Sequence, residues 1–271
     1  MTKTIKDVKN YWDSRPCNAS LSNRDKHTKE YFDEIEKRKY FTEPHIPAFA
    51  EFPKWRSKKV LEIGCGIGTD TVNFARAGAN VAAVELSEES IKLAEERVKL
   101  YGLENKVKFY LGNAENLSSF VPVEQYDLVY SFGVIHHSPH PEKIFEEITK
   151  YLGPESVVKI MLYHKYGWPA LRLFLKRGHK VCWNYGKFLK NFHVGEKDCP
   201  IVNKYSRAEV KKLMYGYKIK KFSVDHIFPY FRDKAKKGIY EKPFYFKIMP
   251  NFLLRLIERA IGWHLLITAK I

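Results

Sequence analysis

The sequence predicts an α/β fold in which a parallel sheet carries helices on both faces. Short apolar runs alternate with helical segments from Lys59 to Leu162. The first apolar run ends in three closely spaced glycines, Gly64, Gly66 and Gly68, directly before a helical segment. Because strands that alternate with helices at this spacing form βαβ units, we expect them to lie parallel in one sheet.

Each element of this central region has a local signal. Five apolar runs predict buried strands at residues 60–63, 80–84, 107–111, 126–130 and 156–162. Apolar residues at helical spacing predict helices at residues 69–77, 88–101 and 141–151. Ser87 can cap the second helix at its start, and Gly78 and Gly102 follow the first and second helices, where glycine commonly ends a helix.

The flanking regions are less regular. Residues 1–54 predict irregular helices without a strand, and Pro44 and Pro47 are expected to break the helical structure at that point. The basic, aromatic stretch at residues 166–192 is expected to be helical in part. The rest predicts a helix capped by Ser206, a sixth strand, an amphipathic helix and a last strand, at residues 206–214, 217–228, 251–260 and 264–269.

The composition is that of a folded protein of a reducing compartment. The chain has 271 residues, 45% hydrophobic and 29% charged, which excludes a disordered or fibrous protein. The wide spacing of Cys17, Cys65, Cys182 and Cys199 argues against a disulfide framework or a zinc ribbon. The first 13 residues are charged throughout, and no uncharged apolar run approaches the length of a membrane span. A soluble, cytoplasmic protein is therefore expected.

The positive charge is concentrated in the last third of the chain. The formal net charge is +16, and residues 161–271 contain 24 basic and 7 acidic residues, a local excess of +17. A surface field of one sign steers anionic partners toward it. A lysine-rich surface that only keeps the protein in solution would have the same composition.

The glycine loop indicates a ligand of nucleotide type. Glycines after a strand permit a tight turn and let a ligand approach the backbone. Glu85 ends the second strand, 21 residues after Gly64, where an acidic side chain commonly accepts the hydroxyl protons of a ribose. The alternative is a nicotinamide-dependent dehydrogenase, which the short G-x-G-x-G spacing disfavours.

Four motifs in order resemble those of the class I S-adenosylmethionine-dependent methyltransferases, in the small-molecule branch that includes quinone-biosynthesis enzymes. They are VLEIGCGIG at residues 60–68, VELS at 84–87, GNAE at 112–115, and YDLVYS at 126–131 followed by two histidines. The resemblance covers about residues 55–165 and implies a Rossmann-like, doubly wound, seven-stranded sheet whose last strand is antiparallel. It also implies S-adenosylmethionine as the cofactor.

The resemblance assigns a cofactor contact to each motif. The first motif would face the methionine part, the second the ribose, the third the adenine, and the end of the fourth strand the sulfonium. The residues are Glu62, Gly64, Cys65, Gly66 and Gly68 in the first motif, Glu85 and Leu86 in the second, Asn113 and Ala114 in the third, and Ser131 and Phe132 in the fourth. Leu86 would also touch the adenine. Asn113 replaces the usual aspartate, but its amide oxygen can still accept from the adenine amino group.

Residues 1–54 are interpreted as a helical lid over the cofactor. Tyr11, Arg15 and Tyr31 are predicted to contact the cofactor, because aromatic faces attract a sulfonium and a guanidinium binds a carboxylate, and Trp12 beside Tyr11 offers another aromatic face. Ordinary helix packing is the alternative for these side chains. The remaining predicted units are a cofactor-binding core, a basic aromatic insertion and the completion of the sheet, at residues 55–165, 166–205 and 206–271.

Methyl transfer from a sulfonium needs mainly alignment and a dry pocket, with a base where the acceptor carries a proton. The candidates follow the fourth and fifth strands, because ligands bind at the carboxyl ends of strands in such sheets. They are His136, His137, Tyr163 and His164. No metal site is expected, since no carboxylate or cysteine lies at ligand spacing from these histidines.

The basic last third leaves the class of acceptor open. Basic and aromatic residues alternate at residues 172–177, 180–187 and 231–237. That pattern suits RNA, an anionic membrane surface, or an anionic small molecule. We favour a small or lipid-linked anionic acceptor. An RNA methyltransferase and a non-catalytic S-adenosylmethionine-binding protein are the alternatives, and the acceptor atom and the oligomeric state stay open.

Overall fold

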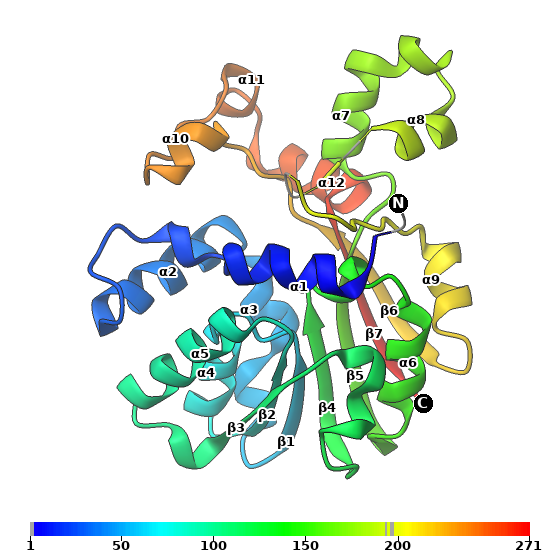
Figure 1. Cartoon of the computed structure of the whole chain (residues 1–271). Coiled ribbons are helices and arrows are strands. Elements are labelled where there is room, and N and C mark those ends of the chain that lie inside the picture. Colours follow the sequence, from blue (N-terminus) through cyan, green and yellow to red (C-terminus); the bar gives the residue numbers. More distant parts are fainter. Residues whose placement is uncertain (1–2, 193, 196–197) are drawn as a thin grey trace.

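The computed structural model describes residues 3–192, 194–195 and 198–271 and confirms the predicted fold class (Figure 1). Seven strands form one sheet in the order β3-β2-β1-β4-β5-β7-β6. β1 to β5 run parallel to one another, whereas β7 runs antiparallel to both β5 and β6. The strands are β1 (Lys59–Ile63), β2 (Asn80–Glu85), β3 (Val107–Leu111), β4 (Tyr126–Phe132), β5 (Leu152–Tyr163), β6 (Lys218–Asp225) and β7 (His264–Lys270).

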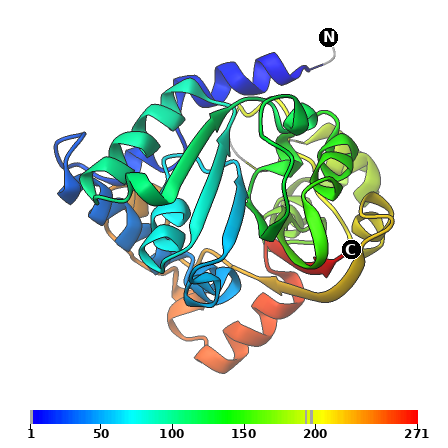
Figure 2. The same cartoon turned by 90° about the horizontal axis from the view of Figure 1, so that it is seen from below.

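Helices cover both faces of the sheet, as Figure 2 shows from below. α4 (Thr69–Arg76) and α5 (Glu88–Leu100) contribute to one apolar core, and α6 (Pro141–Thr149) and α9 (Arg207–Leu213) to another. Along β1, Val60 belongs to the first core and Leu61 and Ile63 to the second. Because side chains of a strand alternate between its faces, this short apolar run supplies both cores at once.

The first 55 residues form three α-helices, α1 (Ile5–Ser14), α2 (Lys29–Thr42) and α3 (His45–Ala50). α1 lies across the carboxyl ends of the strands (Figure 1). The expected break occurs at Pro44, which lies between the end of α2 at Thr42 and the start of α3 at His45, but it is wrong for Pro47, which lies within α3. The backbone N–H groups of a first helical turn have no partner within the helix, so proline is tolerated there.

Strand β5 is four residues longer at its start than the sequence predicts. It begins at Leu152 rather than at Ser156, and the pairing with β4 is irregular between Tyr126 and Leu128. The Ser156 hydroxyl accepts from Gly153 N at 2.7 Å and donates to Tyr126 O at 2.5 Å. This side chain closes the bulge, which lets Gly153 and Pro154 lie within the strand despite their low strand propensity.

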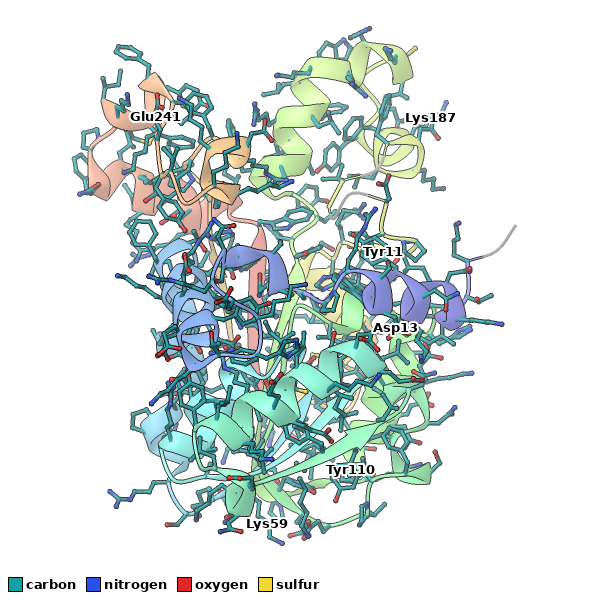
Figure 3. The ribbon with its side chains drawn as sticks, turned by 60° about the vertical axis from the view of Figure 1, so that its left-hand side comes forward. Tyr11, Asp13, Lys59, Tyr110, Lys187 and Glu241 are labelled. Atoms are coloured by element: carbon teal, nitrogen blue, oxygen red, sulfur yellow. The ribbon has the colours of Figure 1, made fainter. Side chains whose placement is uncertain are left out.

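Two helical lobes rise beyond the carboxyl ends of the strands. One contains α7 (Trp168–Arg177) and α8 (Tyr185–Asn191), and the other α10 (Arg232–Lys236), α11 (Phe244–Lys247) and α12 (Asn251–Ile261). In Figure 3, Lys187 and Glu241 mark the two lobes, Tyr11 and Asp13 mark α1 below them, and Lys59 marks the opposite end of the molecule. Among the described residues, no helix is both long enough and apolar enough to cross a bilayer.

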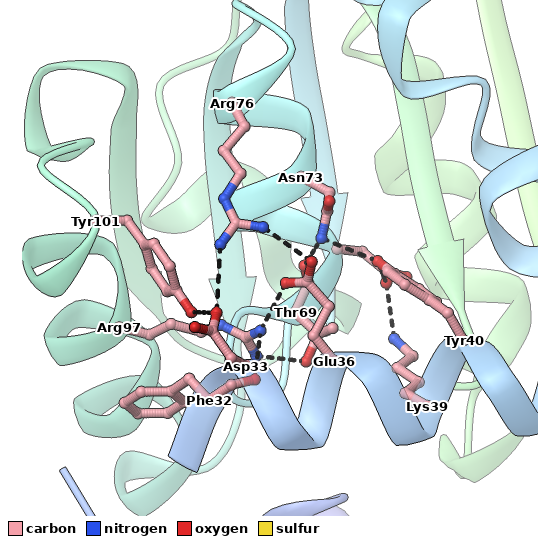
Figure 4. A network of polar contacts seen from close by, with 11 residues as sticks. Phe32, Asp33, Glu36, Lys39, Tyr40, Thr69, Asn73, Arg76, Arg97 and Tyr101 are labelled. Carbon is pink, nitrogen blue, oxygen red and sulfur yellow. Dashed lines mark hydrogen bonds and ion pairs between the residues drawn. The ribbon is translucent and has the colours of Figure 1, made fainter. Parts of the chain in front are cut away.

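A buried arginine fixes α2 to the sheet-covering helices (Figure 4). Arg97 of α5 has no exposed surface and donates to Thr69 Oγ1 at 2.6 Å, to Phe32 O at 3.2 Å and to Glu36 Oε2 at 2.9 Å. Arg76 of α4 also donates to Glu36, at 2.8 Å. These contacts join α2 to α4 and α5, so α2 is part of the packed body of the protein.

We expect Arg97→Met to lower the free energy of unfolding by about 3 kcal/mol, because it leaves Glu36 and the Phe32 carbonyl without their buried donor. Urea unfolding followed by circular dichroism measures this change. The matched control is the exposed Arg24→Met, which should change stability by less than about 0.5 kcal/mol. Equal effects of the two substitutions would contradict the role given to Arg97.

Candidate functional site

The loop between β1 and α4 turns sharply because its glycines adopt left-handed backbone angles. Gly64, Gly66 and Gly68 have φ values of +77°, +55° and +74°. A Cβ on Gly64 would lie 2.2 Å from the Val134 side chain, whereas a Cβ on Gly66 would meet open space. Gly64 is therefore required for close packing, and Gly66 leaves room beside the backbone for a ligand.

The carboxylate of Glu85 joins this loop to the loop after β2. Its Oε2 accepts from Gly66 N at 2.8 Å, and its Oε1 accepts from Leu86 N at 2.8 Å and from Ser87 N at 2.9 Å. Burial raises the pKa of Glu85, and these three hydrogen bonds oppose that rise. Three of roughly four acceptor positions of the carboxylate are thus used, and one can serve a ligand hydroxyl.

A pocket opens above these two loops, at the carboxyl ends of the strands. It brings together residues from all four motifs and from the ends of β4 and β5. The predicted residues that line it are Gly64, Cys65, Gly66, Glu85, Leu86, Asn113, Ala114, Phe132, His137 and Tyr163. Asn113 also caps a short 3-10 helix, since its Oδ1 accepts from Glu115 N at 3.1 Å.

The N-terminal region forms another wall of this pocket. Ile5, Val8 and Trp12 of α1 line it, together with Cys17 and Asn18. Of these, the sequence analysis assigned no role to Ile5, Val8, Cys17 or Asn18. The spacing of Ile5, Val8 and Trp12 on one face of a helix was a usable signal. Closing of this segment over a ligand remains a prediction.

The sequence analysis also missed Lys39 and Glu43, which line the pocket from α2 and its C-terminal end. Lys39 Nζ lies 2.7 Å from Asp70 Oδ1, and the hydroxyls of Tyr40 and Tyr130 donate to the same carboxylate at 2.9 and 3.0 Å. Burial alone would lower the pKa of Lys39, but the charge of Asp70 overrides it and the pKa is raised. The pocket therefore has a charged ammonium group at its wall.

Eight predicted site residues do not line the pocket. They are Tyr11, Arg15, Tyr31, Glu62, Gly68, Ser131, His136 and His164. Glu62 is buried and accepts from the Thr71 hydroxyl at 2.6 Å, and Ser131 donates to Ile63 O at 3.0 Å. Tyr31 donates its hydroxyl proton to Ala19 O at 2.7 Å. Each of these three side chains supports the loops and helices around the pocket.

The other predicted residues are held at the edges of the site. Arg15 is largely exposed and lies 3.8 Å from Asp198, and the ring of Tyr11 packs edge-on against Trp12. The ring of His164 is buried, with its Nδ1 3.2 Å from Gly262 O. Gly68 packs against α5, where a Cβ would lie 3.1 Å from that of Ala94.

The adjacent histidines His136 and His137 have different surroundings. His137 lines the pocket, and its Nδ1 lies 2.7 Å from Ile201 O, so Nδ1 carries the proton and Nε2 the lone pair when the ring is neutral. His136 is fully buried, its ring lies 3.8 Å from that of Tyr163, and neither ring nitrogen has a hydrogen-bond partner among the described residues. His137 is therefore the member of the pair that can meet a ligand.

Burial, followed by the charge of His137, holds the pKa of His136 well below its usual range. The unfolded chain binds this proton below about pH 6.5 and the folded chain does not, so stability is expected to fall as the pH drops through that value. The plot of the free energy of unfolding against pH should therefore be less steep for His136→Phe than for the wild type, by about 1 kcal/mol per pH unit between about pH 6 and 5. Urea unfolding at several pH values tests this, with the exposed His179→Phe as the control that keeps the steeper slope.

Comparison with known proteins identifies the family of this chain. Residues 55–194 match the family described as a methyltransferase domain. Norajmaline N-methyltransferase of Rauvolfia serpentina is 34% identical over 114 residues, 41% of this chain and 38% of that protein. Ubiquinone biosynthesis O-methyltransferase of Azoarcus sp. (strain BH72) is 31% identical over 142 residues, 49% of this chain and 58% of that protein. The chain thus spans about two to three fifths of the length of these curated relatives.

Solved structures show the same fold. Magnesium protoporphyrin IX methyltransferase from Synechocystis PCC 6803, with bound S-adenosylhomocysteine, aligns over 98% of both chains with a TM-score of 0.60 and 12% identity. A methyltransferase of Haloferax volcanii, in complex with its activator Trm112, aligns over 97% of this chain and 96% of that chain, with a TM-score of 0.58 and 15% identity. With more than half of its residues matched by the methyltransferase domain, this chain belongs to the class I S-adenosylmethionine-dependent methyltransferase family, whose cofactor is S-adenosylmethionine.

Proposed function

We propose that this protein transfers the methyl group of S-adenosylmethionine to a small or lipid-linked organic acceptor. The observation that carries the proposal is the glycine loop held by Glu85 at the floor of a pocket that continues to His137 and Tyr163. One pocket thus joins a nucleotide-type cradle to candidate acid–base groups. The names of the two curated relatives, one for norajmaline and one for ubiquinone biosynthesis, support a small organic acceptor.

The residues present fit the cofactor. The open space beside Gly66 admits a ligand against the backbone, and Glu85 has an acceptor position left for a ribose hydroxyl. Leu86 and Ala114 offer apolar faces for adenine, with Asn113 at its edge. The charged Lys39 at the wall suits a carboxylate, either of the methionine part or of the acceptor. Phe132 and Trp12 offer aromatic faces to a sulfonium.

S-adenosylmethionine supplies an activated methyl group, which the acceptor atom attacks as the bond from methyl carbon to sulfur breaks. Where the acceptor atom carries a proton, we propose His137 as the base, because Nδ1–H faces Ile201 O and the lone pair is on Nε2. α1 and the apolar residues Val8 and Trp12 keep water from this part of the pocket. His136 and His164 do not line the pocket and are given no part in the transfer.

Calorimetry should show S-adenosylmethionine binding with micromolar affinity, and NAD should not bind. Glu85→Ala should weaken binding by about 10- to 100-fold, which corresponds to about 1.5–3 kcal/mol for a hydrogen bond to a charged group. Glu85→Gln keeps an acceptor oxygen and should weaken it less. Glu89→Ala, on the exposed face of α5, is the matched control that should bind like the wild type.

The same variants identify the acceptor class when labelled methyl groups are followed into fractions of a cell extract. We expect incorporation into small or lipid-soluble molecules by the wild type and by Glu89→Ala, and little by Glu85→Ala. Stoichiometric labelling of purified RNA would contradict the small-acceptor proposal and favour RNA as the substrate of the basic surface.

A lipid-linked acceptor is supported by the unusual orientation of α12. Several of its apolar side chains face outward, with Phe252 70% and Leu256 56% exposed, and its one buried residue among those described is Glu258. In the same lobe, Phe244 of α11 and Ile248 at its C-terminal end are 74% and 63% exposed. Residues 232–259 contain eight basic and three acidic residues. Exposed apolar residues with a basic rim match the interface of an anionic membrane.

We therefore expect the protein to sediment with vesicles of phosphatidylcholine and phosphatidylserine and not with phosphatidylcholine alone. Replacing Phe252 and Leu256 together by serine should weaken this binding about 10-fold or more, because both side chains lose burial in lipid. Val123→Ser, an exposed apolar residue before β4 at the other end of the sheet, is the control. A dimer without lipid that the double variant abolishes would show instead that a second copy covers this face.

A further inference from the structure

Three histidines from distant parts of the sequence converge beside the pocket. His45 comes from α3, His226 follows β6, and His264 begins β7. One ring nitrogen of each lies within 4.8 Å of the others. His45 and His264 are buried, and His264 also lines the pocket. Their positions 45, 226 and 264 form no spacing motif, and the sequence analysis, which considered only the histidines after the fourth and fifth strands, did not identify them as ligands.

In two of these rings, the nitrogen that points away from the other ring, here called the outer nitrogen, faces a carboxylate. His45 Nδ1 lies 3.9 Å from Asp225 Oδ1, and His264 Nε2 lies 3.6 Å from Glu43 Oε1. The inner nitrogens, His45 Nε2 and His264 Nδ1, are 2.9 Å apart. The two inner nitrogens can share one N–H hydrogen bond at this distance. In the tautomer in which each outer nitrogen carries the proton and points it at its carboxylate, two lone pairs face the inner gap, and a cation bound there would stabilise them.

That arrangement is the one expected around a metal ion. Histidine ligands commonly donate their second N–H to a carboxylate, which fixes the tautomer and the ring orientation. Nitrogen ligands of a tetrahedral zinc ion lie about 3.3 Å from one another. His45 Nε2 and His264 Nδ1 are 2.9 Å apart, and the ligand atoms of all three histidines lie within 4.8 Å of one another. His45 Nδ1 is otherwise buried without a hydrogen-bond partner among the described residues. A bound metal would draw Asp225 and this nitrogen together.

The electrostatic surroundings also suit a cation. Two of the neighbouring cations form ion pairs, Lys39 with Asp70 and Arg255 with Glu258 and Asp225. The carboxylates that face His45 and His264 lie close enough to balance the charge of an ion.

We propose that His45, His226 and His264 bind a divalent transition-metal ion, with zinc favoured by three neutral imidazole ligands. Three protein ligands leave one coordination position open, and the place of His264 and Glu43 in the pocket lining directs that position toward the pocket. The part of this inference that concerns the acceptor rests on the proposed function. An acceptor oxygen or nitrogen that binds the open position would be held near the methyl donor and would lose its proton more readily.

The test is metal binding by the tag-free full chain after treatment with a chelator. Titration with Zn²⁺ should show one tight site, and Co²⁺ should produce visible d–d absorption of a four- or five-coordinate nitrogen site. His45→Gln, His226→Gln and His264→Gln should each weaken binding about 100-fold or more. Asp225→Asn and Glu43→Gln should weaken it about 10- to 100-fold, the range for second-sphere carboxylates. The exposed His179→Gln is the matched control and should bind as the wild type does.

Folding and cofactor binding are measured on the same samples. Circular dichroism and S-adenosylmethionine calorimetry separate a misfolded variant from one that has lost only the metal. Wild-type protein without stoichiometric metal binding would overturn the proposal, as would histidine variants that are folded and bind Zn²⁺ like the wild type. A thiolate-to-cobalt absorption band would also overturn it, because it would place the ion on a cysteine. Loss of S-adenosylmethionine binding with metal binding intact would count against the proposed function alone.

Discussion

The hydrogen bonds of the Glu85 carboxylate are the constraint on which the pocket depends. This single group holds the N–H groups of two loops, one after β1 and one after β2, and so fixes the distance between the glycine turn and the start of α5. The turn itself needs Gly64 because Val134 occupies the space of a side chain. Backbone conformation, side-chain packing and a buried charge therefore together shape the crevice at the carboxyl ends of the parallel strands.

The walls of the pocket come from segments that differ in how extensively they are bonded to the sheet and its covering helices. α2 is joined to α4 and α5 by a fully buried guanidinium and belongs to the rigid body of the domain. α1 is a short helix that precedes α2 in the chain, and it contributes Val8 and Trp12 to the pocket. The two lobes rise above the same end of the sheet and carry exposed apolar side chains, such as Leu175 and Phe252. Access to the pocket is thus bordered by surfaces of apolar and basic character.

The sequence predicted those features of the fold and the site that depend on residues close together in the chain. The central strands and helices were predicted from the periodicity of apolar residues and from helix caps. The four motifs identified the family, and together with the end of the fifth strand they identified ten residues of the pocket lining. Tertiary contacts decided the rest. The bulge that lengthens β5 depends on Ser156 bonding across to Tyr126, and the outward apolar face of α12 cannot be told from an inward one by periodicity alone. Lys39 is held at the pocket wall by its ion pair with Asp70, a contact between distant parts of the sequence. The three converging histidines are likewise distant in sequence, and only the completed fold brings them together.

The position of β7 has a consequence for the order in which the molecule can be made. β7 pairs with β5 on one side and β6 on the other, although it comes after both in the sequence. While the chain is still being synthesised, these two strands must wait with open edges until residues 264–270 leave the ribosome. Such long-range pairing is slow, and open edges invite association with other chains. His264, which this strand brings to the pocket, emerges after every other residue of the pocket lining, so the wall of the pocket is completed only when the sheet closes.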